Sequence, residues 1–241
     1  MLFNPWMRRC LGSLCAILTA FTLGCPGAAK PQPEPEERVT HCDASSQGVT
    51  QNEAGGTRIR LEQGTLTGFG ESQIGVTNIQ EKWAGLHIQP QAQNAPYRLN
   101  MSVCEGEVVP IDANLYRIVN IHRSSSVSNL PGASTGYVEI DSTPLKLHDI
   151  QLPRDHLLIP LNARAEMAGD DNHAYNIEVV ALNASTAQLD VWPVGYLNKQ
   201  SHSVKSGEKL NIGPHSLTIR SLVPSDSQTG LRGFVDIEYR P

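Results

Sequence analysis

The sequence predicts an all-β protein with two tandem, sequence-duplicated antiparallel units behind a signal peptide and a proline-rich tether. Three observations predict this architecture. Blocks of the chain repeat at an offset of about 100 residues. Apolar residues alternate with polar ones, which is the period of two that is typical of strands. Finally, 20 glycines and 16 prolines punctuate the 241 residues, while helical stripes are scarce.

The first element is a signal peptide over residues 1–24. Arg8 and Arg9 form a basic region, and an apolar run of secretory type follows over residues 10–23. A helix that spans a bilayer needs about 20 apolar residues, so this shorter run favours export over a membrane span.

The signal ends in Thr22-Leu23-Gly24-Cys25. This end resembles the lipobox of bacterial lipoproteins, in which a small residue precedes a cysteine that is acylated and becomes the new N-terminus. The resemblance implies a lipid on Cys25 and a protein anchored to a membrane. In enterobacterial lipoproteins an Asp after the cysteine retains the protein in the inner membrane. This chain has Pro26, which favours the outer membrane. The alternative is an ordinary cleavable signal.

The second element is a tether over residues 25–55. Its first part, residues 26–38, holds four prolines and no large apolar residue. Such a composition cannot bury a core and favours extended, polyproline-like conformers. We therefore expect a stalk that holds a folded body away from the membrane.

The folded body is predicted to consist of units 56–144 and 145–241. Residues 102–111 align with residues 203–212, and both blocks carry a Gly-Glu pair. Gly-Tyr-Val-Glu-Ile at 136–140 likewise aligns with a similar block 97 residues later. Strand-rich segments also resemble one another by coincidence, but the shared glycines favour duplication.

Each unit is expected to hold five or six antiparallel strands in a small sandwich or barrel. Val138 and Ile140 alternate with Glu139, which predicts a strand with one buried face. The pairs at 106–107 and 207–208 are predicted to form hairpin turns. The pattern leaves open whether the units share one core.

Two cysteines remain in the mature body, Cys42 and Cys104. An even pair in an exported chain predicts a disulfide, although free thiols or an intermolecular bridge are the alternatives.

Charge and motifs exclude several classes of function. A net charge of −5 lacks the basic footprint of a nucleic-acid binder. The chain has no nucleophile elbow, no His-Glu-x-x-His motif and no phosphate-binding loop, so we predict no cofactor and no catalytic residues.

The connector at 148–173 is the one stretch rich in metal-type ligands. The weak candidates there are His148, His156, Asp171 and His173. Their spacing matches no tight metal motif, so a solvated linker is the preferred interpretation. A hydrolase or a ligand- or metal-binding site in this connector is the alternative.

A contact surface is predicted at the loop 122–135, which is longer than its counterpart in the second unit; a tolerated loop insertion is the alternative. The candidate residues there are Arg123, Ser125 and Asn129. Trp192 is a further candidate because it should lie on an outward face, although burial under a loop is the alternative.

These features predict an envelope lipoprotein that acts as a non-enzymatic binding or scaffold module. It would be either a secretion or envelope-assembly component or an inhibitor or immunity protein. The expected partners are the membrane, through Cys25, and an envelope protein.

Overall fold

The computed structural model describes Cys42 and residues 57–91, 97–124, 136–146, 150, 152–154, 156–168 and 174–240. These residues belong to one compact unit, Arg38–Pro241. Among them we find no helix with the length and hydropathy needed to span a bilayer. The predicted signal peptide and, apart from Cys42, the predicted tether lie outside the described residues.

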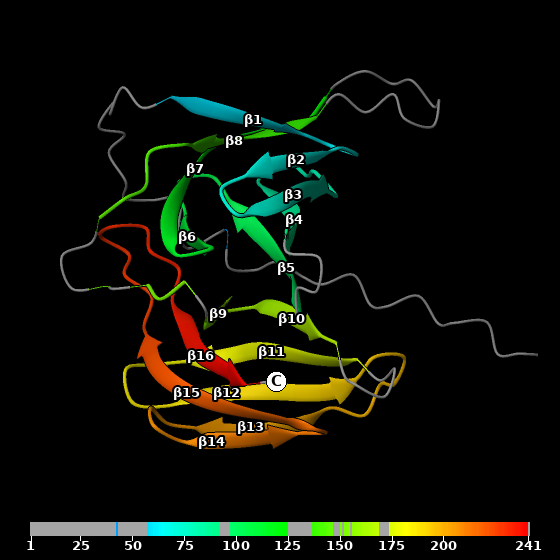
Figure 1. Cartoon of the computed structure of the whole chain (residues 1–241). Helices are drawn as coiled ribbons and strands as arrows, with labels where there is room; N and C mark the ends of the chain where they lie inside the picture. Colours follow the sequence, from blue (N-terminus) through cyan, green and yellow to red (C-terminus); the bar gives the residue numbers. More distant parts are fainter. Residues whose placement is uncertain are drawn as a thin grey trace, which may run out of the picture. The chain divides into compact units, whose positions relative to one another are not determined.

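Sixteen strands make up the described part of the chain (Figure 1). The first eight are β1 (Arg58–Glu62), β2 (Leu66–Phe69), β3 (Ser72–Thr77), β4 (Trp83–Pro90), β5 (Tyr97–Cys104), β6 (Val108–Ile111), β7 (Asn114–His122) and β8 (Tyr137–Asp141). The other eight are β9 (His156–Pro160), β10 (Ala163–Met167), β11 (Tyr175–Leu182), β12 (Ala187–Pro193), β13 (Gln200–Val204), β14 (Lys209–Ile212), β15 (His215–Val223) and β16 (Phe234–Arg240).

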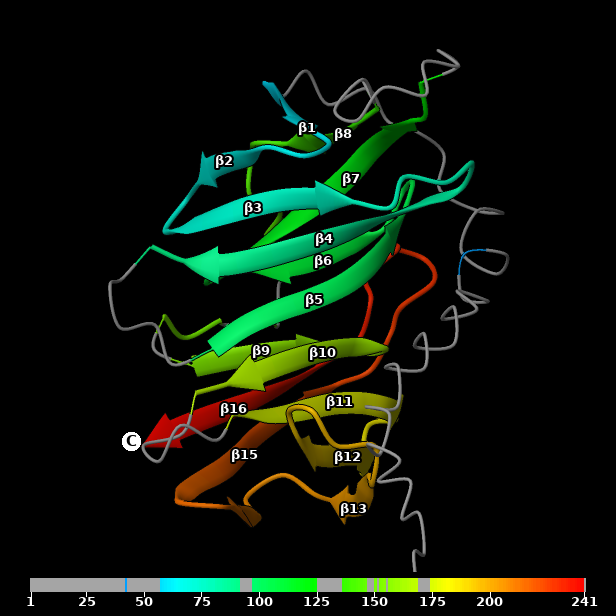
Figure 2. The same ribbon diagram turned by 90° about the vertical axis from the view of Figure 1, so that its right-hand side faces the viewer.

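The strands form three antiparallel sheets. One outer sheet has the order β1-β8-β7-β6, and the other has the order β14-β15-β16-β9. The central sheet has the order β13-β12-β11-β10-β5-β4-β3-β2 (Figure 2). It contains strands from both halves of the chain, the first half being β1–β8 and the second half β9–β16. The predicted all-β, antiparallel fold class is confirmed.

Period-two alternation explains why these segments are strands. In β8, Val138 and Ile140 are fully buried, while Tyr137 and Glu139 are half-buried on the opposite face. The predicted split of this strand into a core face and an outer face is therefore confirmed. β4 shows the same alternation over its first six residues. Each outer sheet thus places one face against the central sheet.

The two halves of the chain correspond in local geometry. Gly106 and Gly207 both have φ of +85°, at an offset of 101 residues. In each turn a glutamate accepts a backbone N–H three residues earlier at 2.9 Å, namely Glu107 from Cys104 and Glu208 from Lys205. The β7–β8 and β15–β16 ladders shift register at matching positions, after Ile118 and after Ile219. Duplication as the origin of this correspondence stays a prediction.

Two details of the predicted units are wrong. The turns at 106–107 and 207–208 are not hairpins, because each joins strands of different sheets, β5 to β6 and β13 to β14. Each half also holds eight described strands, not five or six. Several of these strands are short, since β2 and β6 span four residues each.

The halves share one core. β5 of the first half pairs with β10 of the second half, with Leu99 opposite Ala165. One cluster of buried apolar side chains contains residues of both halves, among them Ile118, Ile177 and Ile219. The question that the sequence left open is therefore answered by a continuous core.

Cys42 and Cys104 form the predicted disulfide, with a Cα–Cα distance of 5.5 Å and a sequence separation of 62. Cys104 is the last residue of β5. The bridge therefore fixes the chain N-terminal to β1 at the end of a strand in the middle of the central sheet.

Candidate functional site

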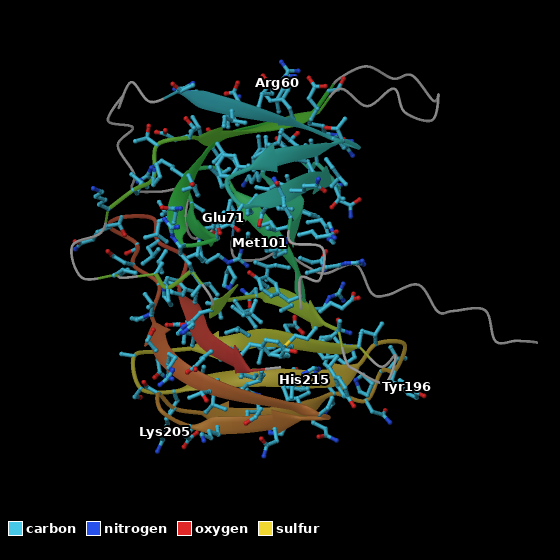
Figure 3. The ribbon with its side chains drawn as sticks, viewed as in Figure 1. Arg60, Glu71, Met101, Tyr196, Lys205 and His215 are labelled. Carbon is cyan, nitrogen blue, oxygen red and sulfur yellow. A yellow bond between two sulfur atoms is a disulfide. The ribbon has the colours of Figure 1, made fainter. Side chains whose placement is uncertain are left out.

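The outer face of the first half carries a cation–aromatic cluster at the strands that flank the loop 122–135. Tyr137 of β8 stacks on His122 of β7, its cross-strand partner, with ring centroids 4.8 Å apart. The guanidinium carbon of Arg60, on β1, lies 3.7 Å from the centre of the Tyr137 ring. Arg60 lies on the outward side of β1 (Figure 3). We call Arg60, His122 and Tyr137 the aromatic cluster.

Polar side chains surround the aromatic cluster. The Nε of Arg60 lies 3.5 Å from Oε1 of Glu62, and both side chains are about half exposed, at 49% and 59%. The Nδ2 of Asn120 donates to Oε2 of Glu139 at 3.4 Å on the same face. The aromatic cluster and these neighbours together present a cation, two rings, carboxylates and an amide, which is a surface suited to polar recognition.

The same positions of the second half are all apolar, and two of the three are buried while Val223 is half-buried. The strand register gives the correspondence between the two halves. Arg60 pairs with Glu139 in the β1–β8 ladder, and Leu158 pairs with Asp236 in the matching β9–β16 ladder. The matched pairs are Arg60 and Leu158, Tyr137 and Phe234, and His122 and Val223. Leu158 and Phe234 are 6% and 1% exposed, and they pack in a second apolar cluster. That cluster also holds Val108 and Leu115 of the first half, and the partly buried Leu145, Ile150 and Leu152, which precede β9, pack against it.

The predicted contact residues have different outcomes. Arg123 is exposed and directly follows His122, the last residue of β7. Ser125 and Asn129 lie outside the described residues.

Trp192 does not offer a free contact surface. By alternation with Asp190 it lies on the outward face of β12, as predicted, but it is only 7% exposed. The ammonium of Lys199 lies 4.3 Å from the centre of its ring, and Lys199 also pairs with Glu178 at 2.6 Å. Trp192 is therefore covered, which was the alternative interpretation.

In the connector, His156 is the one metal candidate that the structure describes. Its Nδ1 lies 2.6 Å from Oδ1 of Asp236, while the hydroxyl of Ser221 donates to Oδ2 of the same carboxylate at 3.3 Å. A nucleophilic triad requires the serine on the imidazole, whereas this serine contacts the carboxylate. The described residues contain no group of three potential metal ligands. His148, Asp171 and His173 lie outside the described ranges.

A small pocket opens beside His156. Its lining residues are Ile88, Tyr97, Leu99, Pro110, Ile111, Asp112, His156 and Leu158. Burial, and secondly the charge of Asp112, raise the pKa of Tyr97 to about 12, so its phenol stays protonated at neutral pH. Asp112 accepts the Ser72 hydroxyl at 2.5 Å and the Glu71 amide at 2.9 Å. These contacts hold Asp112, and with it the β6–β7 turn, against the start of β3.

A buried ion pair joins the two halves. Glu107 and Arg232 are each 5% exposed, and Oε2 of Glu107 lies 3.9 Å from Nη1 of Arg232. The guanidinium also donates to the carbonyls of Leu161, at 2.6 Å, and Ser102. Burial raises the pKa of Glu107, although Arg232 and the amide of Cys104 oppose that rise. These contacts stabilise the junction and leave the pair inaccessible to a ligand.

The sequence indicated the loop 122–135 but not the aromatic cluster beside it. From the sequence, Tyr137 could be identified only as the residue of the first repeat that aligns with Phe234 of the second. A tyrosine in place of a buried phenylalanine in a repeat is the signal that could have identified an exposed position.

Comparison with known proteins gives no match. Neither a family model, nor a curated protein, nor a solved structure is similar to this chain at a significant level.

Proposed function

We propose that this chain is a bacterial envelope lipoprotein, anchored through a lipid on Cys25, that acts as a non-enzymatic binding or scaffold module. The contact surface in this proposal is the aromatic cluster together with Arg123 and the loop 122–135. The partner would be an envelope protein.

One observation carries the proposal. The same three positions are apolar in the second half, where Leu158 and Phe234 are buried and Val223 is half-buried, but they are cationic and aromatic in the first half. A fold that can cover this face with apolar side chains in one half leaves it open and polar in the other. Loops on a rigid sheet are also where recognition surfaces usually lie. The connector alternative has less support, since His156 and Ser221 both contact Asp236.

The contact surface can be tested by photo-crosslinking in the native host. A benzophenone amino acid in place of Arg123 should crosslink to one envelope protein. The same probe in place of Gln188, which is exposed on β12, is the matched control. Arg60→Ala combined with Tyr137→Ala should abolish the crosslink, because these side chains form the proposed surface. An unchanged crosslink in that double variant, or the same product from position 188, would refute the surface.

The anchor is tested separately by the intact mass of protein extracted from membranes. We expect loss of residues 1–24 and added acyl chains, with no acylation in Cys25→Ala. A mature protein without lipid would refute the anchor and leave the contact surface unaffected.

A further inference from the structure

Within the described residues, the central sheet ends in two edge strands, β2 and β13. Among the strands that the structure describes, β2 pairs only with β3, and β13 pairs only with β12. The two strands lie at opposite ends of the sheet in Figure 2. Each edge therefore presents a row of backbone N–H and C=O groups that could accept another strand.

The junction between the halves shows which edges fit each other. In the middle of the sheet, β5 pairs with β10, with Leu99 opposite Ala165 and Asn100 opposite Arg164. β10 of the second half corresponds to β2 of the first half. Arg164 pairs with Glu178 in the β10–β11 ladder, and Leu66 pairs with Gly75 at the matching position of the β2–β3 ladder. In the same way, β13 corresponds to β5. Leu189 pairs with His202 in the β12–β13 ladder, and Leu86 pairs with Met101 at the matching position of the β4–β5 ladder. The two edge strands, β2 and β13, therefore correspond to β10 and β5, the two strands that pair with each other in the middle of the sheet.

Exposed apolar side chains mark the same two places. The large apolar residues that are strongly exposed in the described part of the chain are Leu66 (62%), Val194 (41%), Tyr196 (61%) and Leu197 (85%). Leu66 lies on β2, and the other three lie directly before β13. Figure 3 shows Tyr196 in this segment, at the margin of the molecule. Apolar groups gathered at such places indicate an interaction surface.

Both edges also lack the usual protection. β2 reads Leu-Thr-Gly-Phe and β13 reads Gln-Ser-His-Ser-Val, so neither strand contains a proline, lysine, arginine or carboxylate. Natural edge strands that must stay unpaired commonly carry such residues.

We propose that the β13 edge of one copy pairs with the β2 edge of a second copy, head to tail, in the register of the β5–β10 junction. That register places Gln200 opposite Thr67 and Ser201 opposite Leu66. Because the two edges differ, each pair of copies leaves one edge of each kind free, and the contact extends into open chains or closed rings. This proposal goes beyond the proposed function and does not depend on the lipid anchor.

The contact between copies should be weaker than the internal junction. Inside the chain, Val108 and Leu115 support the junction through apolar contacts on the second half. Their counterparts at the free end, Lys209 and Ser216, are exposed and polar. The assembly should therefore be reversible and depend on protein concentration.

Sedimentation velocity over a concentration series tests the assembly with the mature body. We expect a shift from monomer to larger species as concentration rises. Leu66→Glu should weaken the association about tenfold or more, because it removes an apolar contact and places a charge at the edge. Gln188→Glu, on the exposed face of β12, is the matched control and should leave the association unchanged. A monomer at every concentration would overturn the proposal.

A mixing experiment tests the head-to-tail arrangement. The Leu66→Glu variant keeps its β13 edge, and a Leu197→Glu variant keeps its β2 edge. Alone, each should be monomeric, whereas an equimolar mixture should give dimers and nothing larger. Circular dichroism establishes that both variants fold. If either variant alone dimerised as strongly as the mixture, the contact would join like edges and the proposal would fail.

A mixed disulfide tests the register. A copy with Leu66→Cys and a copy with Ser201→Cys should crosslink on oxidation, because these positions lie opposite each other. Leu66→Cys mixed with Gln188→Cys should not crosslink. A disulfide between two Leu66→Cys copies at equal yield would refute the proposed register.

Discussion

The outer faces of the two halves share one backbone arrangement and differ in what covers them. In the second half, Phe234 packs under the connector and under strands of the first half. In the first half, the matching Tyr137 contacts Arg60 and His122 at the surface. The comparison teaches that the environment of a sheet face, and not the strand geometry, decides whether its residues are buried in a core or exposed at the surface.

The largest expected contrast is between Phe234→Ala and Tyr137→Ala. Phe234→Ala should lower the free energy of unfolding by about 3 to 5 kcal/mol, because it opens a cavity in a fully buried cluster. Tyr137→Ala should cost about 1 kcal/mol, since its ring is only half-buried. Urea unfolding followed by fluorescence measures both values. Equal losses would show that the two faces do the same structural work.

A smaller contrast is expected between the matched glutamates. Glu107→Ala should cost about 3 kcal/mol, because it removes a buried carboxylate that lies 3.9 Å from the buried guanidinium of Arg232. Glu208→Ala should cost about 1 kcal/mol or less, since an exposed side chain then loses one hydrogen bond to Lys205. The same urea experiment measures both. A costly Glu208→Ala with a neutral Glu107→Ala would contradict the assignment of the ion pair to the junction.

The smallest effect is a dependence of stability on pH. Burial raises the folded-state pKa of Glu107 above its unfolded value of 4.5. The native state therefore holds the proton more tightly, and the resulting stability is present below pH 4.5 and lost as the pH rises through the folded pKa. Glu107→Gln should flatten the unfolding free energy over this interval, whereas Glu208→Gln should keep the wild-type slope. A wild-type slope in Glu107→Gln would contradict this assignment.

Local features of the fold could be predicted from the sequence, whereas long-range ones could not. Val138 and Ile140 showed the alternation that gives β8 its buried face, and the two remaining cysteines indicated the disulfide. The pairing of β5 with β10 left no local signal, because it joins residues that are more than 60 positions apart. Gly106 signals a turn, but the same glycine geometry serves a hairpin and a connection between sheets equally well.

The candidate site was predicted only in part for a similar reason. Arg123 and the loop 122–135 were visible as an insertion relative to the second half. The stacking of Tyr137 on His122 depends on the register of β7 and β8, which the bulge after Ile118 sets. Trp192 lies on the predicted face, yet Lys199 covers it through a contact that alternation does not reveal.

The bond between Cys42 and Cys104 also decides where mechanical load enters the body. A pull on the chain before Cys42 passes directly to the end of β5 and bypasses residues 43–103. Without the bridge, the same pull would act on β1, which lies at the edge of its sheet and could be peeled away strand by strand. With it, the force reaches a strand held on both sides by β4 and β10. An oxidised molecule should therefore resist traction at its N-terminus more strongly than a reduced one.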